Sequence, residues 1–175
     1  NGHTNITSSR FLVFGVKGML SAAKNVRNAM LFNVLSFMSD KLLTVGNTVA
    51  ALDELYIWLS NPTAIEYIRN CLKRVRKKES AMLLASQNLE DFDQEGVREM
   101  TKPLFSIPPH QFLFNAGSID KRSYMDMLQL EESEYNLIKF PQRGVCLYKC
   151  GNERYLLEVH APAYKEKLFG TAGGR

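Results

Sequence analysis

The chain has 175 residues, of which 45% are hydrophobic and 23% charged, so it has enough apolar material for a folded domain with a core. Charged residues interrupt its apolar stretches before they reach the ~20 residues of a membrane-spanning helix, and the sequence predicts no transmembrane segment. A formal net charge of +4 is too small to indicate nucleic-acid binding by itself. The three cysteines form no pattern typical of a disulfide framework or a zinc site, and we expect them to pack in the core.

The first half of the chain is expected to alternate between strands and helices. Short apolar runs predict three buried strands, at residues 11–16, 48–52 and 81–85. Apolar residues at three- and four-residue steps predict a helix over about residues 19–43, which Gly46-Asn47 ends. A second helix begins at Asn61-Pro62, because asparagine caps a helix and proline suits its first turn.

The second half has a different pattern. After an irregular segment at 91–101, we expect a fourth strand at 111–114 and short helices at 120–130 and 131–138. Residues 144–149 and 154–159 are predicted to form a hairpin around Gly151-Asn152, a strong turn signal.

This order of elements predicts an α/β fold. Strands separated by helices indicate a mostly parallel sheet, to which the C-terminal hairpin adds antiparallel strands at one edge. Neither a repeat nor a low-complexity linker divides the chain, so we expect a single domain over residues 1–175.

Two acidic residues follow the strand at 48–52. Asp53 and Glu54 are expected at its carboxyl end, the edge at which open α/β sheets bind ligands. In a nucleotide-hydrolysing site, Asp53 would hold Mg²⁺, directly or through water, and Glu54 would orient and polarise the attacking water. The alternative is that both acids only cap the next helix and offset its dipole.

Gln87 closes the next apolar strand, in the run ASQ at 85–87. Neighbouring strands lie ~4.8 Å apart, so its amide is expected beside the acids, where it would sense the γ-phosphate or the attacking water.

A basic run, KRVRKK at residues 73–78, ends the helix between these two strands. Its cations are favourably placed and solvated at a helix C-terminus. A second interpretation is that one arginine is a finger that stabilises transition-state charge on a neighbouring subunit's nucleotide. A third is contact with the phosphate backbone of DNA or RNA.

The chain resembles the ATPases that energise type IV secretion and conjugative DNA transfer, the VirB4-like proteins, in the forms carried by conjugative elements. The resemblance lies in ALDELYIWLSNPTAIEYIRNCLKRVRKKESAMLLASQNLEDF, RGVCLYKCGNERYLLEVHAP and EKLFGTAGGR, and it covers almost the whole chain. In that family a strand ending in Asp-Glu, a basic helix end and a strand ending in Gln follow one another at this spacing. The combination is far more specific than the acidic pair alone.

The resemblance implies a partial RecA-like P-loop NTPase fold and assigns roles by position. Asp53 and Glu54 match the Walker B pair, and Gln87 matches the sensor glutamine. Arg76 is our choice for the arginine finger, with Arg74 in reserve.

The resemblance also implies a function and partners. It implies a motor that uses ATP and Mg²⁺ to drive pilus assembly and the transfer of DNA or protein. The expected partners are further copies of the chain in a hexamer, other type IV secretion subunits and, as a candidate, DNA. The implied location is the cytoplasm or the cytoplasmic face of the inner membrane, as a peripheral protein.

One departure from the family is large. The phosphate loop GxxxxGK[ST] is absent from the 175 residues, so we expect it on an upstream part of a longer protein. Its strand would sit between two of the strands present here, so we expect the chain to self-associate, to rearrange or to have been cut from a longer folded chain.

Two alternatives remain open. A DNA-pumping translocase of the same superfamily shares the acids, the glutamine and the finger, and steep salt dependence of DNA binding would favour it. A degenerate, non-hydrolysing assembly module would be favoured if the longer protein also lacks a phosphate loop.

We predict that the 175-residue chain alone has no ATPase activity and at most weak nucleotide affinity, because the phosphate cradle and its lysine are missing. Steady-state phosphate release from the purified chain checks this prediction. Release above the enzyme-free background would contradict it.

Overall fold

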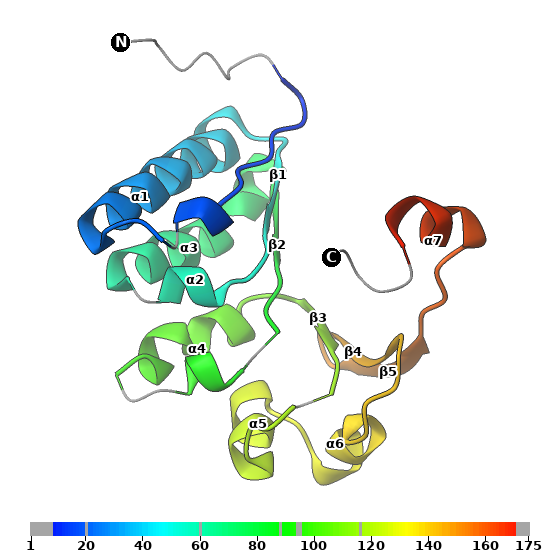
Figure 1. Cartoon of the computed structure of the whole chain (residues 1–175). Helices are drawn as coiled ribbons and strands as arrows, with labels where there is room; N and C mark the ends of the chain where they lie inside the picture. Colours follow the sequence, from blue (N-terminus) through cyan, green and yellow to red (C-terminus); the bar gives the residue numbers. More distant parts are fainter. Residues whose placement is uncertain are drawn as a thin grey trace, which may run out of the picture. The chain divides into compact units, whose positions relative to one another are not determined.

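The computed structural model of the chain describes residues 9–19, 21–59, 61–87, 89–93, 96–115 and 117–170. The chain divides into two compact units, Asn1–Ala85 and Ser86–Arg175 (Figure 1). The single domain expected over residues 1–175 stays a prediction.

The first unit opens with a long helix, as predicted. After a short turn of 3₁₀-helix at Lys17–Met19, helix α1 runs over Lys24–Asp40 and continues into a π-helical turn, η2, at Lys41–Val45. Its buried face carries Leu31, Leu35, Met38 and Leu42. The helix ends where expected, because Gly46 adopts φ 77° and a Cβ there would lie 2.8 Å from the Lys78 carbonyl oxygen.

Two of the three predicted strands form a parallel pair. Strand β1 (Val49–Leu52) pairs with β2 (Ala81–Leu84), in a register that aligns Leu52 with Leu84. Between them the chain forms α2 (Tyr56–Leu59), α3 (Pro62–Arg74) and the 3₁₀-helix η3 (Val75–Lys78). This helical crossover is what allows consecutive strands to run parallel.

Helix α3 begins as the sequence predicts. The Asn61 side chain accepts a hydrogen bond of 3.0 Å from the Thr63 N–H, and Pro62 is the first helical residue. Ile65, Ile68 and Cys71 form its buried stripe.

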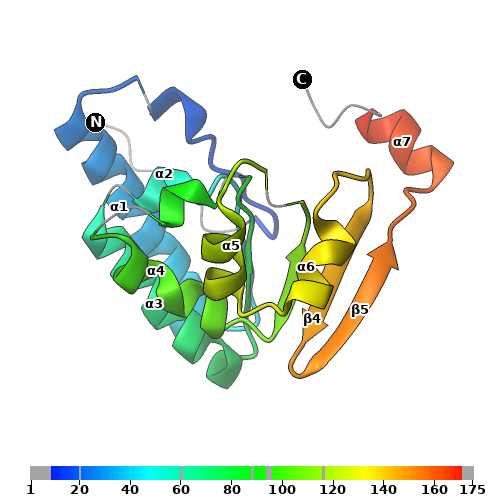
Figure 2. The ribbon, with the colours of Figure 1, turned by 90° about the horizontal axis from the view of Figure 1, so that it is seen from below.

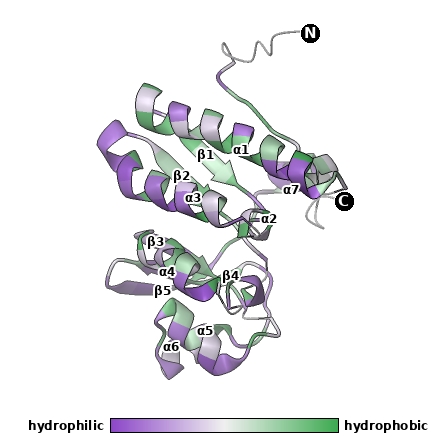
Figure 3. Ribbon diagram, turned by 90° about the vertical axis from the view of Figure 1, so that its left-hand side faces the viewer, coloured by the Kyte–Doolittle hydropathy of each residue, from purple (hydrophilic) through white to green (hydrophobic). Residues whose placement is uncertain are grey.

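The two faces of the parallel pair differ. The face with Leu52 packs on the helices of its unit, and Leu52 is buried. The other face is open, with Val49 66% and Leu83 61% exposed, although β1 is among the apolar segments in Figure 3. Parallel strands are normally covered on both faces, so the predicted burial of these strands is correct for one face only.

The strand predicted at residues 11–16 is wrong. This segment pairs with neither β1 nor β2, and Phe11 and Val13 are 82% and 77% exposed. Phe14 packs edge-to-face on Phe37 of α1, with ring centroids 5.6 Å apart. An apolar run shows that a segment suits a buried strand, but it does not show that a partner strand is present.

The second unit is built on an antiparallel sheet in the order β3-β4-β5. Its strands are β3 (His110–Leu113), β4 (Val145–Cys150) and β5 (Glu153–Glu158). The predicted hairpin is confirmed, with Gly151 and Asn152 between β4 and β5. Within the described part of the chain, the hairpin's neighbour is β3 and not the β1–β2 pair, to which we expected it to add.

Five helical segments accompany this sheet: η4 (Glu90–Phe92), α4 (Arg98–Ser106), α5 (Lys121–Leu128), α6 (Glu132–Ile138) and α7 (Ala163–Phe169). The helices expected at 120–130 and 131–138 are confirmed as α5 and α6. The segment expected to be irregular at 91–101 instead leads into α4 at Arg98, and the buried Thr101 hydroxyl bonds the Val97 carbonyl.

One face of the antiparallel sheet forms the core of the second unit. Leu113 and Leu147 of the sheet join Tyr124 and Leu128 of α5 and Ile138 of α6 in one buried cluster. Figure 2 shows α6 beside the β4–β5 hairpin that it packs on.

Replacing the cap residue tests the start of α3. We expect Asn61→Ala to lower the free energy of unfolding by about 1 kcal/mol, because the Thr63 N–H loses its acceptor. Asn61→Asp keeps an acceptor oxygen and should unfold as the parent does. Urea unfolding followed by circular dichroism measures both, and equal losses in the two variants would contradict the capping role.

Candidate functional site

Asp53 and Glu54 lie at the carboxyl end of β1, as the sequence predicts. Asp53 is exposed and Glu54 half-buried, in the turn between β1 and α2. Backbone hydrogen bonds tie this turn to the end of β2: the Ala85 N–H donates to the Leu52 carbonyl, and the Leu55 N–H donates to the Ala85 carbonyl, each at 2.9 Å. The turn that carries the acids is therefore held to the sheet on both sides.

The backbone of Glu54 is left-handed. Its φ is 51°, a region that costs a non-glycine residue ~1–2 kcal/mol. One oxygen of the Asp53 carboxylate accepts the Glu54 N–H at 2.9 Å, which stabilises this conformation. Strain of this kind is found where a site requires a particular side chain at a sharp turn.

The carboxylates suit a magnesium ion bound together with phosphates. Mg²⁺ in such sites takes one or two carboxylates and completes its shell with water and phosphate oxygens. The Asp53 side chain is exposed, so its second carboxylate oxygen is accessible from solvent. The described ranges hold no cluster of three or more potential ligands, so an all-protein metal cage is not what this part of the chain provides.

Gln87 follows the end of β2 by three residues. Its side chain is exposed, and the residue belongs to the second compact unit. The register of the strands aligns their last residues, Leu52 and Leu84, so the chain leaves both strands at the same end of the pair. The convergence of the Gln87 amide with the two carboxylates stays a prediction.

The two candidate finger residues lie at the other end of the β1–β2 pair. Arg74 ends α3, Arg76 lies in η3, and both are exposed just before β2 begins at Ala81. The acids follow the carboxyl end of β1, so a strand length of ~13 Å, at ~3.3 Å per residue, separates the two ends. The structure therefore does not bring either arginine to the acids of its own chain.

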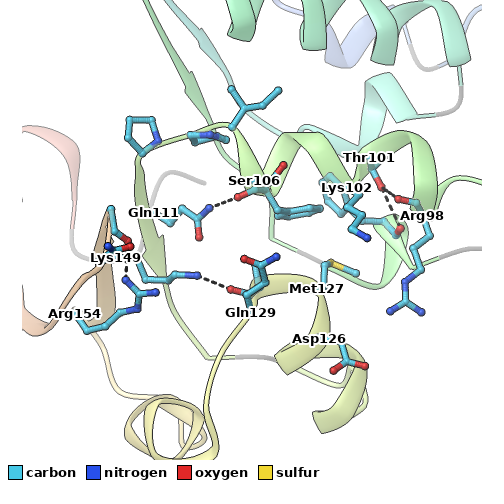
Figure 4. A pocket seen from close by; sticks show the side chains of 18 of the residues that line it. Arg98, Thr101, Lys102, Ser106, Gln111, Asp126, Met127, Gln129, Lys149 and Arg154 are labelled. Carbon is cyan, nitrogen blue, oxygen red and sulfur yellow. Dashed lines mark hydrogen bonds between the residues drawn. The ribbon is translucent and has the colours of Figure 1, made fainter.

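A concavity in the second unit has no counterpart in the sequence-based predictions. It has a volume of about 770 Å³ and lies among α4, β3, the end of α5 and the β4–β5 hairpin (Figure 4). Sequence reasoning missed it because its wall comes from four separate segments, each with an ordinary pattern. Its buried cation, Lys149, has only one signal in the sequence, a charged residue inside an apolar strand.

None of the helices within the described ranges has the length and apolar character required to cross a bilayer.

Comparison with known proteins gives consistent matches. No family model matches the chain. A probable conjugal transfer protein TrbE of Sinorhizobium fredii is 28% identical over 141 residues, which are 78% of this chain and 20% of that protein. The conjugal transfer protein TrbE of Rhizobium radiobacter is 31% identical over 101 residues, which are 57% of this chain and 12% of that protein.

A solved structure matches as well. The structure of VirB4 of Thermoanaerobacter pseudethanolicus superposes with a TM-score of 0.77 and 29% sequence identity, over 88% of this chain and 42% of that one. The expected resemblance to VirB4-like proteins and the expected fold class, a partial RecA-like α/β fold, are thereby confirmed. The chain spans a fifth or less of the length of these curated relatives.

The strained backbone at Glu54 makes a measurable prediction. We expect Glu54→Gly to raise the free energy of unfolding by about 0.5–1 kcal/mol, because glycine adopts positive φ without the steric cost, although it has more entropy to lose. Glu79→Gly, at φ 52° after η3, is a matched control and should gain a similar amount. Urea unfolding measures both, and a clear loss of stability in Glu54→Gly alone would show that its side chain stabilises the turn.

Proposed function

We propose that this chain is the C-terminal part of the motor domain of a VirB4-like ATPase, which couples ATP hydrolysis to transfer of DNA or protein through the cell envelope and to pilus assembly. The observation that carries this proposal is the position of Asp53 and Glu54 in the turn that links β1 to α2, tied to the end of β2. The similarity to conjugal transfer proteins and to VirB4 supports it.

Asp53 acts in this proposal as the residue that holds Mg²⁺, directly or through water. The hydrogen bond from the Glu54 N–H fixes one carboxylate oxygen and leaves the other toward solvent. ATP with Mg²⁺ supplies a polarised γ-phosphate when bound, and the phosphate loop that would cradle it lies outside these 175 residues.

Glu54 acts as the residue that orients the attacking water and polarises it. Its left-handed backbone turns the chain sharply after β1, and the buried Leu52 and Leu55 on either side anchor the turn. Such an anchored carboxylate keeps its position while the substrate changes, which is what positioning catalysis requires. Gln87 is proposed to sense the γ-phosphate or the same water.

Arg76, or Arg74 in its place, is proposed to act on the nucleotide of a neighbouring copy. Support comes from their exposure and from their place at the end of the β1–β2 pair remote from the acids of the same chain. This arrangement requires a ring of subunits, for which a hexamer is our proposal.

The partners and location follow from the same proposal. Other type IV secretion subunits, and DNA as a candidate cargo, are the expected partners in the cytoplasm or at the cytoplasmic face of the inner membrane. The names of the relatives, which are conjugal transfer proteins, support this assignment.

The proposal is tested in the longer protein that joins this chain to a phosphate loop. We expect Glu54→Gln to lower kcat for ATP hydrolysis by about 100-fold or more with little change in nucleotide affinity, because the amide no longer polarises water. Steady-state phosphate release and binding of a fluorescent ATP analogue measure the two quantities.

Glu79→Gln removes an exposed carboxylate at the opposite end of the strands and is the matched control, which should hydrolyse ATP at the parent rate. Full activity in Glu54→Gln would exclude the proposed role. A longer protein without a phosphate loop would favour the non-hydrolysing assembly module.

A further inference from the structure

Lys149 is a buried cation at the wall of the concavity in the second unit. It lies in the central strand β4, and its residue is only 8% exposed. Its ammonium group donates a hydrogen bond to the Leu128 carbonyl at the end of α5, an interaction that Figure 4 shows. An ammonium has three N–H donors, so two remain beside the concavity after this bond.

No carboxylate neutralises Lys149 among the described residues, where it makes no ion pair. Its cross-strand neighbour in β5 is another cation, Arg154, and like charges opposite each other destabilise a sheet. Burial, and then the charge of Arg154, lower the pKa of Lys149, while Glu134 opposes them. The carbonyl end of α5 offsets only part of this cost.

The other charges around the concavity are arranged unevenly. Arg154 pairs with Glu134 at 2.9 Å, and Arg98 pairs with Asp93 at 3.4 Å, so both guanidinium groups have acidic partners. The remaining acids of the wall are Glu99 on α4 and Asp126 on α5. Figure 4 shows Asp126 well separated from Lys149, which leaves the Lys149 end without an acid of its own beyond Glu134.

A second polar group near Lys149 also lacks a partner. The side-chain oxygen of Gln111 is buried and accepts no hydrogen bond among the described residues, while its amide nitrogen donates to the Phe105 carbonyl. Figure 4 places Gln111 and Lys149 at the same end of the concavity. This end therefore offers unused ammonium donors beside an unused acceptor, a combination that matches a hydrogen-bearing oxyanion.

We propose that the Lys149 end of this concavity binds a phosphate-class oxyanion. The ammonium of Lys149 supplies charge and two donors, and the Gln111 oxygen accepts the proton of a monohydrogen phosphate. The volume of about 770 Å³ admits inorganic phosphate and also a nucleotide-sized molecule that carries the same group. The proposal does not depend on the proposed motor function, because Asp53 and Glu54 belong to the other unit.

Titration of the ¹⁵N-labelled 175-residue chain with inorganic phosphate tests the proposal. We expect saturable shifts of the amide signals of Lys149, Gln111 and Gln129, with a Kd at or below about 10 mM. Lys149→Met should weaken this binding at least about tenfold, because it removes the charge and keeps most of the side-chain length. A parallel titration with ADP shows whether the phosphate group is bound more tightly when it is part of a nucleotide.

Two further variants keep the result interpretable. Gln129→Glu places a carboxylate beside the same helix end without removing a buried group, and it should also weaken phosphate binding about tenfold. Lys77→Met removes an exposed lysine of the first unit and should bind phosphate as the parent does. No saturation by phosphate up to about 10 mM, or equal weakening by Lys77→Met, would overturn the proposal and leave Lys149 as a helix cap only.

Discussion

Two backbone hydrogen bonds at the end of the parallel pair hold the candidate nucleotide site in place. The Ala85 N–H bonds the Leu52 carbonyl, and the Ala85 carbonyl accepts the Leu55 N–H, so one residue of the β2 end holds the chain before and after the acidic pair. Leu52 and Leu55 are buried, which fixes both ends of the turn by packing as well. Between them the chain must reverse from strand to helix within two residues, and the left-handed Glu54 is the consequence. The position of the carboxylates therefore follows from strand register and burial, and not from contacts that the carboxylates make themselves.

Local signals in the sequence were sufficient for most elements. The Asn61 cap with Pro62, the end of a helix at Gly46 and the two-residue turn at Gly151 each depend on the chemistry of one or two residues. Such signals work because a cap or a turn is decided by its own backbone, whatever the rest of the chain does. The position of Asp53 and Glu54 was predictable for a related reason, since an apolar run followed by acids marks the point where a strand ends.

Features that depend on partners distant in the sequence were not predictable. The apolar run at 11–16 looks like a buried strand, but its strandedness depends on a neighbour that the run cannot encode. The hairpin was recognisable, whereas its pairing with β3 was not, because register with a remote strand leaves no local mark. Arg76 lies near Gln87 in sequence, yet the helix returns it to the far end of the strands from the acids. Lys149 and Gln111 meet only through the fold of the second unit.

The open face of the β1–β2 pair has a thermodynamic consequence for the chain. Hydration of apolar surface raises the heat capacity, and unfolding normally exposes enough of it to add ~12–15 cal/mol/K per residue. Val49 and Leu83 already meet water in the folded state, so unfolding adds little to their hydration. Whatever segment or copy covers this face would enlarge the heat-capacity increment and narrow the temperature range of greatest stability. The curvature of the stability curve thus reports directly on whether the sheet is sheltered on its second side.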